Sequence, residues 1–136
     1  MGAWSHEPFG NDTASDWSDG MLESEDLSPV ESALDVVIET ADEYLEVDQA
    51  SEAIAAVEVI AKLLGKGTQS DASTEDIDKW VKNHPQMPSS TLLQKARQAI
   101  KRIQQPNSEL LELWEEGGEP AEWNASLEKL LVAIGA

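Results

Sequence analysis

Residues 53–64, AIAAVEVIAKLL, decide the fold. In a helix with a rotation of about 100° per residue, Ser51, Glu58 and Lys62 fall within one narrow stripe, and every other side is apolar. A helix that is apolar almost all round is normally surrounded by other helices. The sequence therefore predicts a central helix over about residues 49–64, capped by Asp48 and ended by Gly65.

Helix signals also lie on both sides of this stretch. Residues 28–31, Ser-Pro-Val-Glu, have the pattern of a capping box and predict a helix over about residues 29–46. Start and stop residues indicate further helices after Asn11 or Asp12, before His84, from Ser90, from Asn107 or Ser108, and from Pro120. No segment shows the alternation of a strand. We expect an all-α fold, a compact bundle of about six or seven helices in a single domain over residues 1–136.

The charge of the chain is strongly negative and unevenly distributed. Asp and Glu number 27 against 9 Lys and Arg, and the first 61 residues contain 16 of these acids and no Lys or Arg. Such a charge repels nucleic acid and anionic lipid, so neither is expected as a partner. A basic protein is the partner that this charge favours, although it also suits a protein kept soluble by charge alone. The candidate contact residues are acids of the first half: Asp16, Asp19, Glu23, Asp35 and Glu39.

Several classes of site are absent from the sequence. Without cysteine, the chain has no disulfide, thiolate zinc site or cysteine nucleophile, and it suits a reducing cytoplasm. No apolar run is long enough to span a membrane, and the N-terminus does not resemble a signal peptide. Phosphate-loop, dinucleotide and serine-elbow patterns are missing. His6 and His84 lack metal-ligand spacing. We therefore expect no catalytic residues, metal site or cofactor; nothing in the sequence indicates the oligomeric state.

The first seventeen residues form an unusual string, and three later segments accompany it. The matching residues are Met1-Gly2-Ala3-Trp4, Pro8-Phe9, Asn11-Asp12, Ala14, Asp16-Trp17, Tyr44-Leu45-Glu46, Ser51, Ala53, Ala55-Ala56, Glu58, Ser108-Glu109-Leu110 and Glu112-Leu113-Trp114. This pattern resembles the bacterial family called domain of unknown function 4259. The resemblance implies an α-helical fold and a cytoplasmic setting, and it implies no particular reaction.

Trp4 and Phe9 are large apolar residues in a stretch that is too short and polar to form a core of its own. We therefore expect an extended N-terminal plug that packs these two side chains against the helices. Their burial would be structural; a platform for a ligand is the alternative interpretation.

Glu58 is the most unusual charge because it lies in the most apolar helix. One interpretation is an exposed pair with Lys62, four residues later. The other is a buried carboxylate that accepts hydrogen bonds from the N-terminal segment, for example from the Trp4 indole or from backbone amides.

Two functions follow from these observations. The first is a protein-binding module, similar to an immunity or antitoxin protein, that binds a basic partner such as a nuclease. The second is a small-ligand-binding protein or enzyme with a carboxylate site at Glu58, Asp12 and Tyr44. A cleft that brings two of these residues together would favour the second, and an exposed acidic surface without such a cleft would favour the first. The sequence favours a non-catalytic role.

Overall fold

The computed structural model describes residues 8–9, 11–118 and 120–135, except for the side chain of Ser73. Within these residues the chain forms seven α-helices and one 3-10 turn, with no strand. The helices are α1 (Asp12–Leu22), α2 (Ser28–Thr40), α3 (Val47–Leu63), α4 (Glu75–Asn83), α5 (Ser90–Ile103), α6 (Glu109–Gly117) and α7 (Pro120–Ala133), and the turn is η1 (Ala72–Thr74). The prediction of an all-α bundle of six or seven helices is therefore confirmed.

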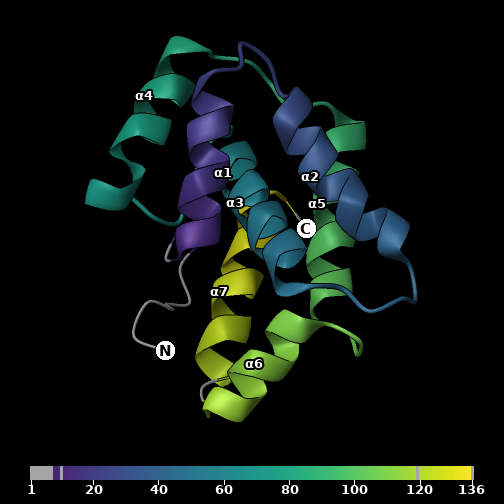
Figure 1. Ribbon diagram of the computed structural model, residues 1–136. Coiled ribbons are helices and arrows are strands. Elements are labelled where there is room, and N and C mark those ends of the chain that lie inside the picture. Colours follow the sequence, from purple (N-terminus) through teal and green to yellow (C-terminus); the bar gives the residue numbers. More distant parts are fainter. Residues whose placement is uncertain (1–7, 10, 119, 136) are drawn as a thin grey trace.

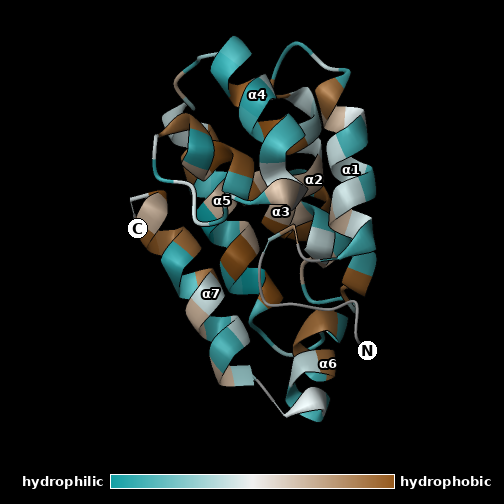
Figure 2. Cartoon of the chain, turned by 90° about the vertical axis from the view of Figure 1, so that its left-hand side faces the viewer, coloured by the Kyte–Doolittle hydropathy of each residue, from teal (hydrophilic) through white to brown (hydrophobic). Residues whose placement is uncertain are grey.

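Helix α3 lies at the centre of the bundle, and the other six helices pack against it (Figure 1). Every residue from Ala53 to Ala61 is buried. The apolar circumference explains this position, because each side of α3 has a neighbouring helix to contact. The outer helices carry bands of both hydrophilic and hydrophobic residues (Figure 2). The predicted central helix is confirmed, but it begins earlier: Glu46 is the cap, and its backbone N–H donates to the Gln49 side chain at 3.4 Å.

The second helix begins within one residue of the predicted start, but the predictions of its cap and of its C-terminal end were wrong. Ser28 is its first residue rather than its cap, and the backbone N–H of Ser28 donates to Asp26 Oδ1 at 2.9 Å. The helix ends at Thr40 rather than near residue 46, because Ala41 adopts a positive φ of 50°. Leu45 is buried as the periodicity suggested, but it lies in a loop that pairs with Ser108 in an isolated β-bridge.

The loop after α2 is held against the far end of α5. Leu45 donates its backbone N–H to Asn107 O at 2.7 Å and accepts from the N–H of Glu109 at 2.9 Å. The Arg102 guanidinium donates to four backbone carbonyls, those of residues 41, 43, 106 and 107. These contacts replace the hydrogen bonds that a longer α2 would have made within itself.

The predicted N-terminal plug is observed at Phe9, which is 3% exposed. Its backbone N–H donates to Gln69 Oε1 at 2.8 Å. Asn11 then caps α1 by accepting from the N–H of Ala14 at 2.9 Å. The second residue of the predicted plug, Trp4, lies outside the described residues. In the described part of the chain, no helix has the length and hydropathy needed to cross a bilayer.

Candidate functional site

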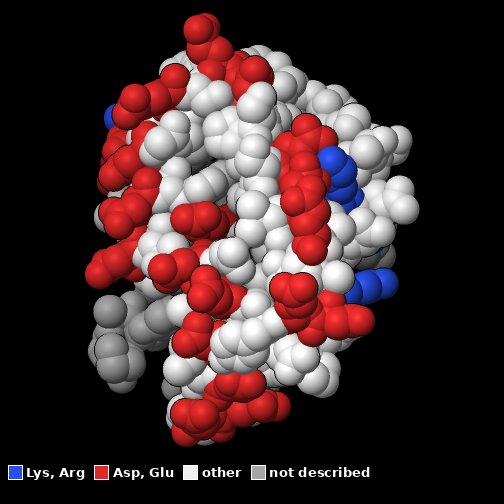
Figure 3. All heavy atoms as spheres, turned by 45° about the vertical axis from the view of Figure 1, so that its right-hand side comes forward, with Lys and Arg blue, Asp and Glu red and all other residues white. Residues whose placement is uncertain are grey.

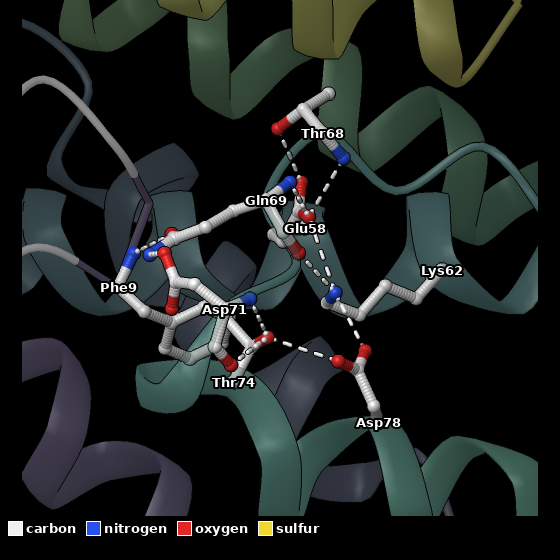
Figure 4. Close-up of polar contacts among 8 residues, drawn as sticks. All are labelled: Phe9, Glu58, Lys62, Thr68, Gln69, Asp71, Thr74 and Asp78. Carbon is white, nitrogen blue, oxygen red and sulfur yellow. Dashed lines mark hydrogen bonds and ion pairs between the residues drawn. The ribbon is translucent and has the colours of Figure 1, made fainter.

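Glu58 is a fully buried carboxylate in the middle of α3. Its oxygens accept three hydrogen bonds from the loop that follows the helix: from Thr68 N at 2.8 Å, from Thr68 Oγ1 at 2.7 Å and from Gln69 N at 2.9 Å (Figure 4). A buried carboxylate is stable only when such donors replace its water. The prediction of a buried, hydrogen-bonded Glu58 is confirmed. The donors in the described part of the chain, however, belong to Thr68 and Gln69, and the donor named as an example from the sequence, Trp4, lies outside the described residues.

Lys62 lies beside Glu58, and its side chain is only 6% exposed. Its Nζ is 3.6 Å from Glu58 Oε2 and 2.6 Å from Asp78 Oδ1 on α4, and it also donates to the carbonyl of Gln69. The pair that the sequence suggested does form, but in the interior rather than on an exposed stripe. Burial raises the pKa of Glu58, whereas the hydrogen bonds from Gln69 and Thr68 and the charge of Lys62 act to lower it.

Gln69 connects this carboxylate to the N-terminal chain. It is 4% exposed; its side chain accepts from Phe9 N and donates to Asp71 Oδ2 at 3.0 Å. Thr74 completes the network by donating to Asp78 Oδ2 at 2.9 Å and accepting from Asp71 N at 3.1 Å. Figure 4 shows these side chains pointing toward one another from α3, the loop and α4. The central carboxylate is fully buried and already accepts three hydrogen bonds from the protein, so the arrangement resembles a structural junction rather than an open site.

The other two candidates for a carboxylate site lie elsewhere. Asp12 is an exposed residue in the first turn of α1. Tyr44 is 49% exposed in the loop after α2, and its hydroxyl donates to Glu112 Oε1 at 2.8 Å. That hydrogen bond, with smaller contributions from desolvation and from the charges of nearby glutamates, raises the pKa of Tyr44 to about 12. Glu58, Asp12 and Tyr44 share no hydrogen bond, and the described residues hold no cluster of three His, Cys, Asp or Glu side chains suited to a metal ion.

Tyr44 instead lines a shallow hollow of about 440 Å³ between the end of α2 and the start of α3. The lining residues are Val36, Glu39, Thr40, Glu43, Tyr44, Glu46 and Gln49. Val36 is 41% exposed, and the three glutamates are exposed. The sequence suggested Glu39 and Tyr44 separately but did not suggest the hollow, because it depends on the end of α2 at Thr40. A positive φ is usually marked by a glycine. Because this position is an alanine, Ala41, no signal in the sequence indicated the turn.

The acids chosen as candidate partner contacts fall into two groups. Asp16, Asp19 and Glu23, on α1 and at its end, and Glu39, on α2, are all exposed. Asp35 is half-buried and its Oδ1 is 2.9 Å from Lys95 Nζ. Lys95 also contacts Glu31 Oε2 at 2.8 Å, so the two acids of α2 share one lysine of α5. Asp35 is therefore already paired within the fold and is a weaker candidate contact than the other four.

Acidic side chains cover much of the surface seen in Figure 3, where basic ones are few.

A family model described as "Domain of unknown function (DUF4259)" matches residues 2–126. The comparisons with curated proteins and with solved structures found no match.

Proposed function

We propose that this chain, which belongs to the DUF4259 family, is a protein-binding module that takes a basic protein partner, as immunity and antitoxin proteins do. The observation that carries the proposal is the hollow beside Tyr44, in which two exposed side chains, Val36 and Tyr44, are surrounded by Glu39, Glu43 and Glu46. An aromatic and apolar centre with a charged rim is the usual composition of a protein contact surface.

The fold does not neutralise its negative charge internally. In the part of the chain that the structure describes, Lys62 and Lys95 are the two cations paired with carboxylates. Arg102 is directed at backbone carbonyls instead. Most of the excess of 27 acids over 9 bases therefore remains at the surface. The negative electrostatic potential of this surface attracts a cationic partner and accelerates its association.

The geometry of the hollow suits a lysine or arginine side chain from that partner. Glu112 fixes the hydroxyl of Tyr44, so little freedom of the ring is lost on contact. The aliphatic part of a basic side chain can cover Val36 and Tyr44 while its charge lies among the glutamates. The alternative function, a carboxylate site for a small ligand, has less support, because Glu58 is fully buried, already accepts hydrogen bonds from Thr68 and Gln69, and does not line the hollow.

The test is capture of the partner by the full chain, followed by its identification and by association rates at two salt concentrations. We expect a basic protein whose association slows as salt screens charge over about 10 Å at 0.1 M. The double variant Glu43→Gln/Tyr44→Ser should weaken binding, whereas Glu122→Gln/Glu128→Gln, which alters exposed acids of α7, should affect it much less. A neutral or acidic partner, or a rate indifferent to salt, would contradict the proposal.

A further inference from the structure

The acidic helix α1 is held at both ends by one segment of the chain, residues 65–83. Before α1, Phe9 donates its backbone N–H to Gln69 Oε1 at 2.8 Å. After α1, the carbonyl of Ser24 accepts from Trp80 Nε1 at 2.8 Å. Gln69 lies in the loop after α3, and Trp80 lies on α4, which neighbours α1 in Figure 1. The chain on either side of α1 is thus fixed by two side chains only eleven positions apart in sequence.

Helix α1 is intrinsically weak. It has 11 residues, DTASDWSDGML, including Gly20 in its interior, and only Ala14 and Met21 are fully buried. Asp12 and Asp16 are like charges four residues apart, and the last turn has no basic residue to offset the helix dipole. Isolated helices shorter than about 12 residues are marginal in water. The conformation of α1 therefore depends on contacts with the rest of the protein.

The two anchoring residues are themselves held by further contacts. The backbone N–H of Gln69 is fixed by Glu58, and its side-chain amide by Asp71. Trp80 is 4% exposed and stacks on His84, with ring centroids 4.4 Å apart and planes inclined by 13°. An additional contact of α1, from Thr13 Oγ1 to Asp48 Oδ1 at 3.1 Å, is exposed and competes with water. The buried contact to Gln69 and the partly buried contact to Trp80 are thus the stronger polar restraints on α1.

We infer that Gln69 and Trp80 form a clamp that sets the docking of α1, and that α1 opens as a unit while α2, α3 and α5 stay folded. Cooperative opening of one weakly held element is a common feature of folded proteins. Because α1 carries Asp16, Asp19 and the neighbouring Glu23, the clamp also determines whether these acids are presented as one fixed surface. This last consequence rests on the proposed function, whereas the opening of α1 does not.

Amide hydrogen exchange of the full chain tests the clamp without any partner. Trp80→Phe keeps a ring against His84 and removes the indole N–H, and Gln69→Ala removes the acceptor of Phe9 N. We expect each variant to accelerate exchange of the α1 amides by about three- to tenfold, the effect of one buried hydrogen bond, with smaller changes in α2 and α5. The matched controls are Trp123→Phe on α7 and Gln104→Ala, whose side chain contacts Asn124.

Each outcome decides for or against the clamp. Faster exchange confined to α1 in both anchor variants, and absent in both controls, supports it. Unchanged exchange in α1 would show that these two contacts do not restrain the helix. An equal increase in α1 and α5 would show that α1 opens only with the whole protein. Either result overturns the clamp. If α1 is released but association with a captured basic partner is unchanged, the clamp stands and the role of α1 in binding is wrong.

Discussion

Glu58 accepts both the backbone N–H and the hydroxyl of Thr68, at 2.8 and 2.7 Å, from a residue ten positions further along the chain. This double contact turns the chain back over α3 directly after the helix ends. Gly67 lies in this loop close to α3, and a Cβ at this position would lie 2.7 Å from Lys62 Cγ. The carboxylate and the glycine together allow the loop to close on the helix.

Glu58→Ala should destabilise the protein by about 1 to 3 kcal/mol, because it leaves three donors without their acceptor, one of them, Gln69 N, in a buried contact and the two of Thr68 in partly buried ones. The free energy of unfolding in urea measures the effect. Glu128→Ala, at an exposed position of α7, is the control and should stay within about 0.5 kcal/mol of the wild type. Equal midpoints for Glu58→Ala and the wild type would show that other groups or water satisfy those donors.

The raised pKa of Glu58 predicts the sign of a pH effect. An acid whose pKa is higher in the folded than in the unfolded chain contributes stability below its unfolded pKa, and this contribution is lost as pH rises through the folded pKa. The unfolding free energy of the wild type minus that of Glu58→Gln, which cannot titrate, should therefore fall as pH rises above the ordinary value of 4.5. Unfolding curves at a series of pH values give this difference. An increase of this difference over the same pH range would mean that the hydrogen bonds lower the pKa of Glu58 more than burial raises it.

Tyr44 is the single tyrosine of the chain, so its ionisation can be followed directly by ultraviolet absorbance. The hydrogen bond to Glu112, which places the pKa at about 12, should be lost in Glu112→Ala, and the midpoint should move toward the usual value of about 10. Glu115→Ala, a neighbouring acid that does not contact Tyr44, should leave the midpoint in place. Identical titrations for all three proteins would exclude the contact in solution.

Two glycine substitutions should act in opposite directions. Gly67→Ala forces Lys62 to shift and should cost about 1 to 3 kcal/mol. Gly20→Ala adds a methyl group with no atom within 4 Å in the interior of α1, and should stabilise the protein by about 0.5 to 1 kcal/mol. Thermal unfolding compares both with the wild type. Destabilisation by Gly20→Ala would contradict the open surroundings of that position.

The central position of α3 could be predicted because an apolar circumference has only one favourable environment. The burial of Glu58 followed for the same reason. The caps of α1 and α6 could be narrowed to two residues each by their side-chain type, and the structure shows Asn11 and Ser108 in these roles. The donors to Glu58 could not be predicted. They come from a loop whose return depends on the packing of α3 and α4, and such a path has no periodicity in sequence.

The end of α2 could not be predicted, because an apolar residue beyond the helix falls by chance at a helical spacing. Leu45 continues the helical repeat of α2, yet its burial arises from pairing with Ser108, a residue far along the chain. A similarly long separation in sequence concealed the ion pair between Asp35 and Lys95. The hollow was missed with the end of α2, because its lining combines residues before and after Ala41.

The contacts of Arg102 with the loop after α2 also order events during folding. Arg102 and Ala41 are 61 positions apart, so this contact can form only after α2 and α5, which can each form locally and sooner, have come together. The hollow beside Tyr44 takes its shape from this loop. We therefore expect it to be completed late, after the helices have assembled, so that a partly folded chain would already carry its charge but would not yet have the hollow.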